Sequence, residues 1–223
     1  MQEKIVKMFD EIASSYDMVN RIVSFGSDKI WREKAIKEVL KYSKENPKVL
    51  DVACGSGDMI DIWKKYTNNI IGLDPSKGML EVAKKRFPEI NFYQGFAQDL
   101  PFENESFDCL SISFGIRNVV EIDKAIDEFY RVLKKDGILL ILEFTKPEKK
   151  STIRNCIDFY SNKILPKIGS IISGNKEAYE YLPKSIQKFY TLNELCKKLS
   201  KFEILEAKNF ALSPTSMIIA KKN

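Results

Sequence analysis

The chain has 223 residues and a formal net charge of +5, with 44% hydrophobic and 30% charged residues and no histidine. These values are typical of one soluble globular domain with a substantial core, and the longest apolar runs are far too short to cross a bilayer. The four cysteines have neither metal nor redox spacing and no nucleic-acid-binding motif is present, so we expect no metal and no nucleic-acid partner.

The N-terminal segment, about residues 1–46, reads as helical and partly amphipathic. It begins with the charged stretch MQEKIVKMFD, which is not a signal-peptide pattern, so we expect a cytoplasmic protein. Because this segment precedes the first strand pattern, we expect it to form a helical lid that carries Tyr16 and Asp17.

Short apolar strands then alternate with helical patterns. The predicted strands span 48–53, 69–74, 90–95, 107–113 and 137–144, and the predicted helices span 58–66, 78–87 and 121–135. This alternation predicts an α/β fold with a mostly parallel sheet and helices on both faces. The tail carries two further strand patterns, 202–210 and 216–222, which suit a terminal hairpin or an antiparallel edge strand. We therefore expect one Rossmann-like domain over residues 1–223.

The first strand ends in the stretch VLDVACGSGD, where Gly55, Ser56 and Gly57 make the turn into a helix. Glycines at such a turn allow a sharp bend and the close approach of a ligand. Asp74 closes the second strand, where an acid accepts hydrogen bonds from ribose hydroxyls. Together these residues predict a nucleoside-containing cofactor at the carboxyl ends of parallel strands.

The same stretch favours S-adenosylmethionine over a dinucleotide. A dinucleotide site has a third glycine, which is Ile60 here, and Asp51 would repel phosphates. An acid suits the sulfonium and amino groups of S-adenosylmethionine, although Asp51 could instead cap the loop. After the third strand we expect Phe96 and Ala97 to contact the adenine, and at the end of the fourth we expect Ser113 near the methionine end or in the core.

The segment at about 146–190 falls outside the strand–helix alternation and reads as a helical insert. It carries more basic than acidic residues together with an apolar series that includes Ile168 and Ile171. Such a segment could contact anionic lipid at the inner face of the membrane, or its apolar residues could simply pack the insert on the core.

Nearly the whole chain resembles the ubiquinone/menaquinone-biosynthesis C-methyltransferases, which are class I S-adenosylmethionine-dependent enzymes. The more specific parts of the resemblance are the stretches SSYDMVN, FGIRNV and LPKIG, at 14–20, 114–119 and 165–169. The glycine turn and Asp74 are shared by many methyltransferases. Two departures are the serine at position 56, where the family commonly has threonine, and Phe96, where the family often has a polar residue.

The resemblance implies C-methylation of a prenylated quinol by S-adenosylmethionine. The ring carbon becomes nucleophilic when a neighbouring hydroxyl loses its proton, and a guanidinium can stabilise the oxyanion that develops. We therefore expect Arg117 and Asn118 to act on the acceptor, with the proton leaving through water, Tyr16 or Asp17. A surface salt bridge is the alternative for Arg117, and packing in the lid is the alternative for Tyr16.

The ring of the acceptor is left open between a naphthoquinol and a benzoquinol. The chain is rich in lysine, isoleucine and asparagine, which suggests an AT-rich bacterial genome and favours demethylmenaquinol. The alternative function is methylation of another small lipophilic or phenolic acceptor. An NAD-dependent reductase and a non-catalytic binding module fit the motifs less well.

Overall fold

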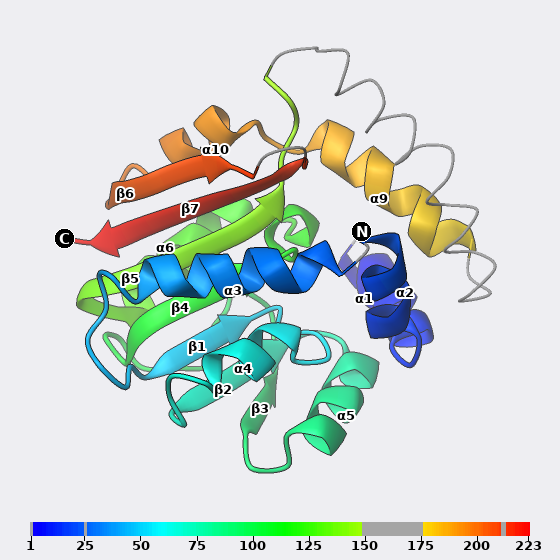
Figure 1. The fold of residues 1–223 in the computed structure, drawn as a ribbon, viewed down its shortest axis with the longest axis horizontal. Helices are drawn as coiled ribbons and strands as arrows, with labels where there is room; N and C mark the ends of the chain where they lie inside the picture. Colours follow the sequence, from blue (N-terminus) through cyan, green and yellow to red (C-terminus); the bar gives the residue numbers. More distant parts are fainter. Residues whose placement is uncertain (1, 25, 149–175, 211–212) are drawn as a thin grey trace.

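A computed structural model describes residues 2–24, 26–148, 176–210 and 213–223. A seven-stranded sheet in the order β3-β2-β1-β4-β5-β7-β6 crosses the molecule (Figure 1). The strands are β1 Val49–Val52, β2 Ile70–Asp74, β3 Asn91–Gln94, β4 Phe107–Ser113, β5 Leu133–Phe144, β6 Phe202–Asn209 and β7 Thr215–Lys222. The first five strands pair in parallel, and β7 pairs antiparallel with both β5 and β6. The predicted fold class and the terminal hairpin are confirmed.

The central strands form because their sequences are predominantly apolar. Every residue of β1 is buried, and in β5 the run from Gly137 to Glu143 is buried without a break. Such runs suit strands that helices cover on both faces. The pairing aligns the carboxyl ends of β1, β2 and β4 at one edge of the sheet, where the glycine turn and Asp74 lie.

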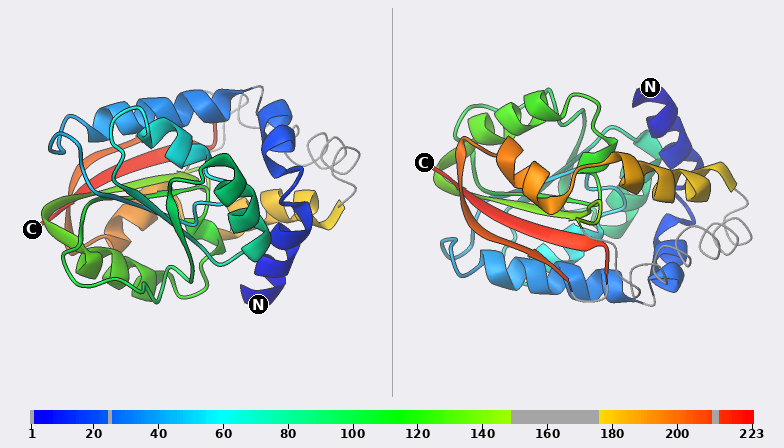
Figure 2. Two further views of the ribbon diagram at one scale, coloured as in Figure 1. Left: turned by 90° about the horizontal axis from the view of Figure 1, so that it is seen from below. Right: turned by 90° about the horizontal axis from the view of Figure 1, so that it is seen from above.

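Two layers of helices cover the sheet (Figure 2). The helices are α1 Gln2–Ile12, α2 Tyr16–Val23, α3 Ser27–Val39, α4 Asp58–Trp63, α5 Lys77–Arg86, the 3-10 turn η1 Ile116–Asn118, α6 Ile122–Val132, α9 Lys176–Lys188 and α10 Leu192–Lys198. Apolar residues of α3, α4 and α5 pack together on one face, and those of α6 and α10 pack on the other. In α6 the buried positions Ile122, Ala125, Ile126 and Phe129 follow helical spacing.

Helices α1, α2 and α9 lie at the edge of the sheet where the parallel strands end (Figure 1). Ile12 and Ala13 pack on Met79 of α5, and Leu182 of α9 joins this small cluster. Helix α3 differs, because its Ala35, Ile36 and Val39 belong to the main core. The part of the N-terminal segment that covers the strand ends is therefore α1 and α2.

Most of the insert lies outside the described residues, including Ile168 and Ile171. Only its end, helix α9, is described, and α9 packs against α1 and η1. Within the described ranges, no helix combines the length and apolar character needed to span a bilayer.

Candidate active site

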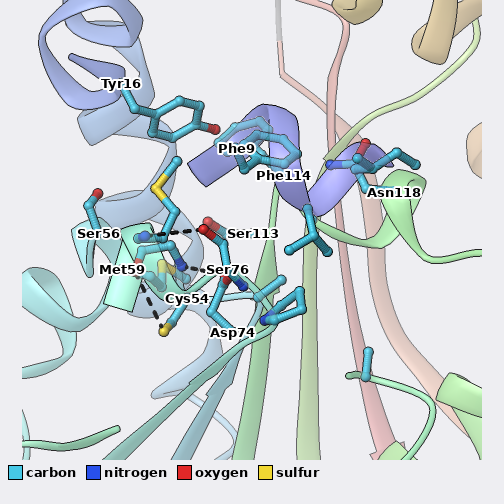
Figure 3. A pocket seen from close by; sticks show the side chains of 18 of the residues that line it. Phe9, Tyr16, Cys54, Ser56, Met59, Asp74, Ser76, Ser113, Phe114 and Asn118 are labelled. Carbon is cyan, nitrogen blue, oxygen red and sulfur yellow. Dashed lines mark hydrogen bonds between the residues drawn. The ribbon is translucent and has the colours of Figure 1, made fainter. Parts of the chain in front are cut away.

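A pocket opens at the carboxyl ends of the parallel strands and encloses about 860 Å³ of empty space, including its mouth. The lining combines the ends of β1, β2 and β4 with α1, α2 and α3. Seven of the predicted site residues line it: Tyr16, Gly55, Ser56, Asp74, Ala97, Ser113 and Asn118. Figure 3 shows most of these side chains converging on one space.

The glycine turn has the backbone that its sequence requires. Gly57 has φ +91°, and a Cβ there would lie 2.7 Å from Cε2 of Phe87, so only glycine fits. Gly55 has φ +54° with no heavy atom within 4 Å of an added Cβ, so its open side belongs to the pocket. Ala53 and Phe114, which follow β1 and β4, also have positive φ values of 51° and 56°. Strained backbone of this kind is concentrated at functional sites.

Asp74 organises the two loops that border the polar half of the pocket. Its Oδ2 accepts from the backbone N–H of Gly55 at 2.8 Å, and its Oδ1 accepts from that of Ser76 at 2.8 Å. Burial raises the pKa of Asp74 to about 6, against the lowering effect of these two hydrogen bonds. Each carboxylate oxygen has a second lone pair, so Asp74 can still accept from a ligand.

The other half of the pocket is largely apolar and aromatic. Phe9 of α1 and Tyr16 of α2 meet edge to face, with ring centroids 5.9 Å apart. Figure 3 shows these two rings with Phe114 on the opposite side of the pocket from Asp74. Burial raises the pKa of the Tyr16 phenol, although the charge of Arg117 acts in the opposite direction. Tyr16 is therefore a neutral hydrogen-bond donor at neutral pH.

Asn118 reaches the pocket from the η1 turn. The hydroxyl of Tyr181, on α9, donates to Oδ1 of Asn118 at 2.9 Å. Because this bond occupies the amide oxygen, it orients the amide so that the Nδ2 donors are the groups left for the pocket.

Arg117 lies in a different position from the one expected. Its side chain is 5% exposed and does not line the pocket. Nη1 donates to Oε1 of Glu143 at 2.6 Å and to the carbonyl of Phe114 at 2.7 Å, and Nε donates to Oγ of Ser185 at 3.3 Å. Arg117 therefore forms a buried ion pair and not a surface salt bridge, and it does not line the pocket in which we expected it to act on the acceptor. Its charge reaches the pocket through its effect on Tyr16.

Four more predicted residues lie outside the pocket lining: Asp17, Asp51, Gly57 and Phe96. Asp17 accepts from Ser56 Oγ and, at 2.8 Å, from Nη1 of Arg86, so it ties α2 to the glycine turn. Phe96 is 38% exposed and does not line the pocket, whereas Ala97 does. The adjacent small residue, and not the aromatic one, faces the adenine position that the sequence predicts.

Asp51 is 1% exposed and sits within β1. Its Oδ1 accepts from Ser111 Oγ at 2.6 Å, while Oδ2 has no partner among the described residues. Burial raises the pKa of Asp51 to about 7. The hydrogen bond of Asp51 goes to a neighbouring strand and not to the loop, so this acid does not cap the loop, and it is not among the residues that line the pocket.

Sequence patterns missed Arg32, the one basic side chain among the described lining residues. A signal for it existed, because Arg32 falls on the same helical face as the buried Ala35, Ile36 and Val39. An arginine within an apolar stripe is unusual and marks a buried cation.

Comparison with known proteins places these features in a family. Residues 1–218 match the ubiE/COQ5 methyltransferase family. A Campylobacter jejuni protein named ubiquinone/menaquinone biosynthesis C-methyltransferase UbiE is 54% identical, with 99% of this chain and 98% of that protein covered. A Thermotoga maritima demethylmenaquinone methyltransferase is 38% identical, with 89% of this chain and 88% of that protein covered.

Solved structures are similar in fold. A SAM-dependent methyltransferase of Thermotoga maritima superimposes with a TM-score of 0.70 at 19% identity, and 97% of this chain and 99% of that one are covered. The [4+2]-cyclase SpnF gives a TM-score of 0.69 at 16% identity, with 100% and 96% covered. The second example shows that this fold serves more than one chemistry, so the reaction has to be argued from the site.

Proposed function

Because the chain belongs to the ubiE/COQ5 methyltransferase family, we propose that it methylates a ring carbon of a prenylated quinol, with S-adenosylmethionine as methyl donor. The favoured acceptor is demethylmenaquinol, which becomes menaquinol. The observation that carries the proposal is the division of one pocket into a polar half around Asp74 and an aromatic half around Phe9 and Tyr16. The first half suits a nucleoside cofactor, and the second suits a ring with an apolar tail.

The donor set of the pocket fits S-adenosylmethionine. Asp74 offers acceptor positions for ribose hydroxyls, and Gly55 leaves its open side to the ligand. The charged side chains of the lining are Asp58, Asp74 and Arg32. Two acids and one base suit a ligand with a sulfonium, an amine and a carboxylate better than a pyrophosphate. When bound, S-adenosylmethionine supplies an electrophilic methyl group on its sulfonium.

The protein has to promote loss of the quinol proton and stabilise the oxyanion that results. Tyr16 can donate through its hydroxyl and Asn118 through its amide, and both line the pocket. We assign Arg117 to electrostatic support of this end from behind the lining, because its charge already acts on Tyr16. Bound S-adenosylmethionine would supply the methyl group to the ring carbon once the hydroxyl proton has left to water. The hydrogen on that carbon would then also have to leave, and a proton would have to return to the oxygen, so that the aromatic quinol is restored with the net release of one proton.

We assign α1 and α2 as a lid over the pocket. Asp10 of α1 accepts from Ser76 Oγ at 2.6 Å and from the Gly78 N–H at 2.8 Å, which fastens α1 to the start of α5. Asp17 fastens α2 to the glycine turn. We therefore assign Asp17 to closing the lid in preference to accepting the proton.

We also propose peripheral contact with the membrane through the 146–190 segment, on the strength of its basic and apolar sequence. Replacing Ile168 and Ile171 with serine should reduce sedimentation with anionic vesicles and should slow turnover of a long-tailed quinol more than that of a short-tailed analogue. Equal turnover losses on both quinols with unchanged sedimentation would refute it.

Complementation tests the proposed function in cells. Expression of the gene in a strain that lacks quinone methylation should convert its demethylmenaquinone into menaquinone, as seen by quinone mass analysis. A strain that accumulates the demethylated quinone despite a folded, expressed protein would contradict the proposal.

A further inference from the structure

We infer that Arg32 binds the carboxylate of the methionyl group of S-adenosylmethionine, an inference that rests on the cofactor assignment in the proposed function. Arg32 is the one basic side chain among the described residues that line the pocket. Only 6% of the residue is exposed, and an arginine buried to this extent needs acceptors for its hydrogen-bond donors.

The arginine is held rigidly in place. Nη1 donates to Oδ2 of Asp28 at 2.9 Å, and both side chains are 8% exposed. Nε donates to Oγ of Ser113 at 3.3 Å, and the guanidinium lies 5.0 Å from the ring centroid of Phe114. Among the described residues, none accepts a hydrogen bond from Nη2, which leaves this nitrogen for a ligand. A guanidinium that is fixed before binding loses little entropy when a carboxylate arrives.

The strand order determines which end of the cofactor lies near Arg32. Ala97 follows β3, Asp74 ends β2, the glycine turn follows β1, and Ser113 ends β4. Since these strands are neighbours in the order β3-β2-β1-β4, the four groups form a row across the pocket. With adenine at Ala97 and ribose at Asp74, the methionyl group has to cross the glycine turn toward Ser113. Arg32 touches Ser113, so its free donor lies at the carboxylate end.

Neighbouring charges agree with this placement. Asp28 also accepts from Ser24 Oγ at 2.8 Å, so its carboxylate is already committed to the protein. The two acids of the lining, Asp58 and Asp74, would repel the cofactor's carboxylate. Arg32 attracts it at the Ser113 end of the pocket. The arrangement orients the cofactor as well as binding it.

Decarboxylated S-adenosylmethionine isolates this contact, because it keeps the sulfonium and the amine and lacks only the carboxylate. Calorimetric titration of the wild-type protein should show S-adenosylmethionine binding at least about tenfold more tightly than the decarboxylated form. Arg32→Gln should weaken S-adenosylmethionine by roughly tenfold to a hundredfold and change binding of the decarboxylated form by less than about threefold. Arg32→Lys should restore part of the selectivity, since it keeps the charge but loses the fork.

Two controls keep the result interpretable. Lys29→Gln removes an exposed cation from the same helix and should leave both affinities unchanged. Because Arg32→Gln leaves Asp28 unpaired, the Asp28→Asn, Arg32→Gln double variant should show the same collapse of selectivity in a protein without the buried charge. Equal weakening of both ligands, or unchanged selectivity in either variant, would overturn the assignment. If the wild-type protein methylates quinol but binds S-adenosylmethionine and the decarboxylated form equally, only the role of Arg32 is overturned. If it prefers S-adenosylmethionine over the decarboxylated form but does not methylate quinol, only the proposed acceptor is overturned.

Discussion

Nη1 of Arg117 and Oε1 of Glu143 lie 2.6 Å apart in an ion pair whose side chains are 5% and 0% exposed. Glu143 also accepts from the backbone N–H of Phe144 at 2.7 Å and from that of Arg117 at 3.3 Å. Burial raises the pKa of Glu143, and the Arg117 charge opposes that shift. The pair links the end of β5 to the turn that presents Asn118.

Breaking this pair from one side should be costly. Glu143→Ala leaves a buried guanidinium uncompensated, and we expect the free energy of unfolding to fall by about 3–5 kcal/mol. An Arg117→Met, Glu143→Leu double variant removes both charges and should recover most of that loss in urea unfolding. If the recovered double variant also methylated quinol at the wild-type single-turnover rate, Arg117 would have a structural role only. We expect instead a loss of roughly a hundredfold.

Asp74→Asn should test whether this acid binds the ribose of the cofactor in addition to holding the loops of Gly55 and Ser76. The amide keeps one acceptor but presents N–H donors toward the backbone N–H of Gly55 or Ser76. We expect affinity for S-adenosylmethionine to fall by at least about tenfold, the scale of a charged hydrogen bond. Calorimetry at pH 8 checks this, with the melting temperature of the free protein as control. An affinity within twofold of wild type would remove Asp74 from the cofactor site.

The pH dependence of stability should report on Asp51. The pKa of its carboxyl is about 7 in the folded protein against an ordinary value of 3.8, so the unfolded state binds fewer protons between those pH values. The contribution of Asp51 to the free energy of unfolding therefore falls as pH rises from about 4 to about 7.

Asp51→Asn should remove this dependence, because the amide is neutral and its oxygen can still accept from Ser111. The stability of the variant relative to wild type should be smaller at pH 5 than at pH 8. The free energy of unfolding of the variant should exceed that of wild type by several kcal/mol at most, because wild type loses about 1.4 kcal/mol for each pH unit between the two pKa values. Urea unfolding at pH 5 and pH 8 measures this. A stability difference that is the same at both would show that Asp51 does not titrate in this window.

The lid makes a kinetic prediction. Asp17→Ala removes the contacts of α2 with Ser56 and Arg86, so we expect the cofactor product to dissociate several-fold faster. Stopped-flow dissociation of S-adenosylhomocysteine measures the rate, and Asp61→Ala on the exposed side of α4 is the matched control. Loss of the methyl-transfer step with unchanged dissociation would instead restore Asp17 as the proton acceptor.

Sequence patterns predicted most of the fold because strands and helices differ in the period of their apolar residues. The glycine turn and Asp74 could also be predicted from the sequence, because their roles depend on their positions relative to the strand ends. The partners of Arg117 could not be predicted from sequence patterns. Glu143 lies 26 positions away near the end of β5, and Ser185 lies 68 positions away on α9. The contact between Asp17 and Ser56 likewise joins residues 39 positions apart. Such pairings depend on how helices dock, which local spacing does not encode.

Transfer of a labelled methyl group by the purified protein tests the central claim most directly. With S-adenosylmethionine carrying a ¹³C methyl and reduced demethylmenaquinol as acceptor, we predict a menaquinol whose new ¹³C resonance is that of a ring-bound methyl. Tyr16→Phe and Asn118→Ala should slow its formation while leaving cofactor affinity within about twofold, because both are assigned to the acceptor. An unlabelled quinol, an O-methyl resonance, or transfer only to an unrelated phenol would contradict the account.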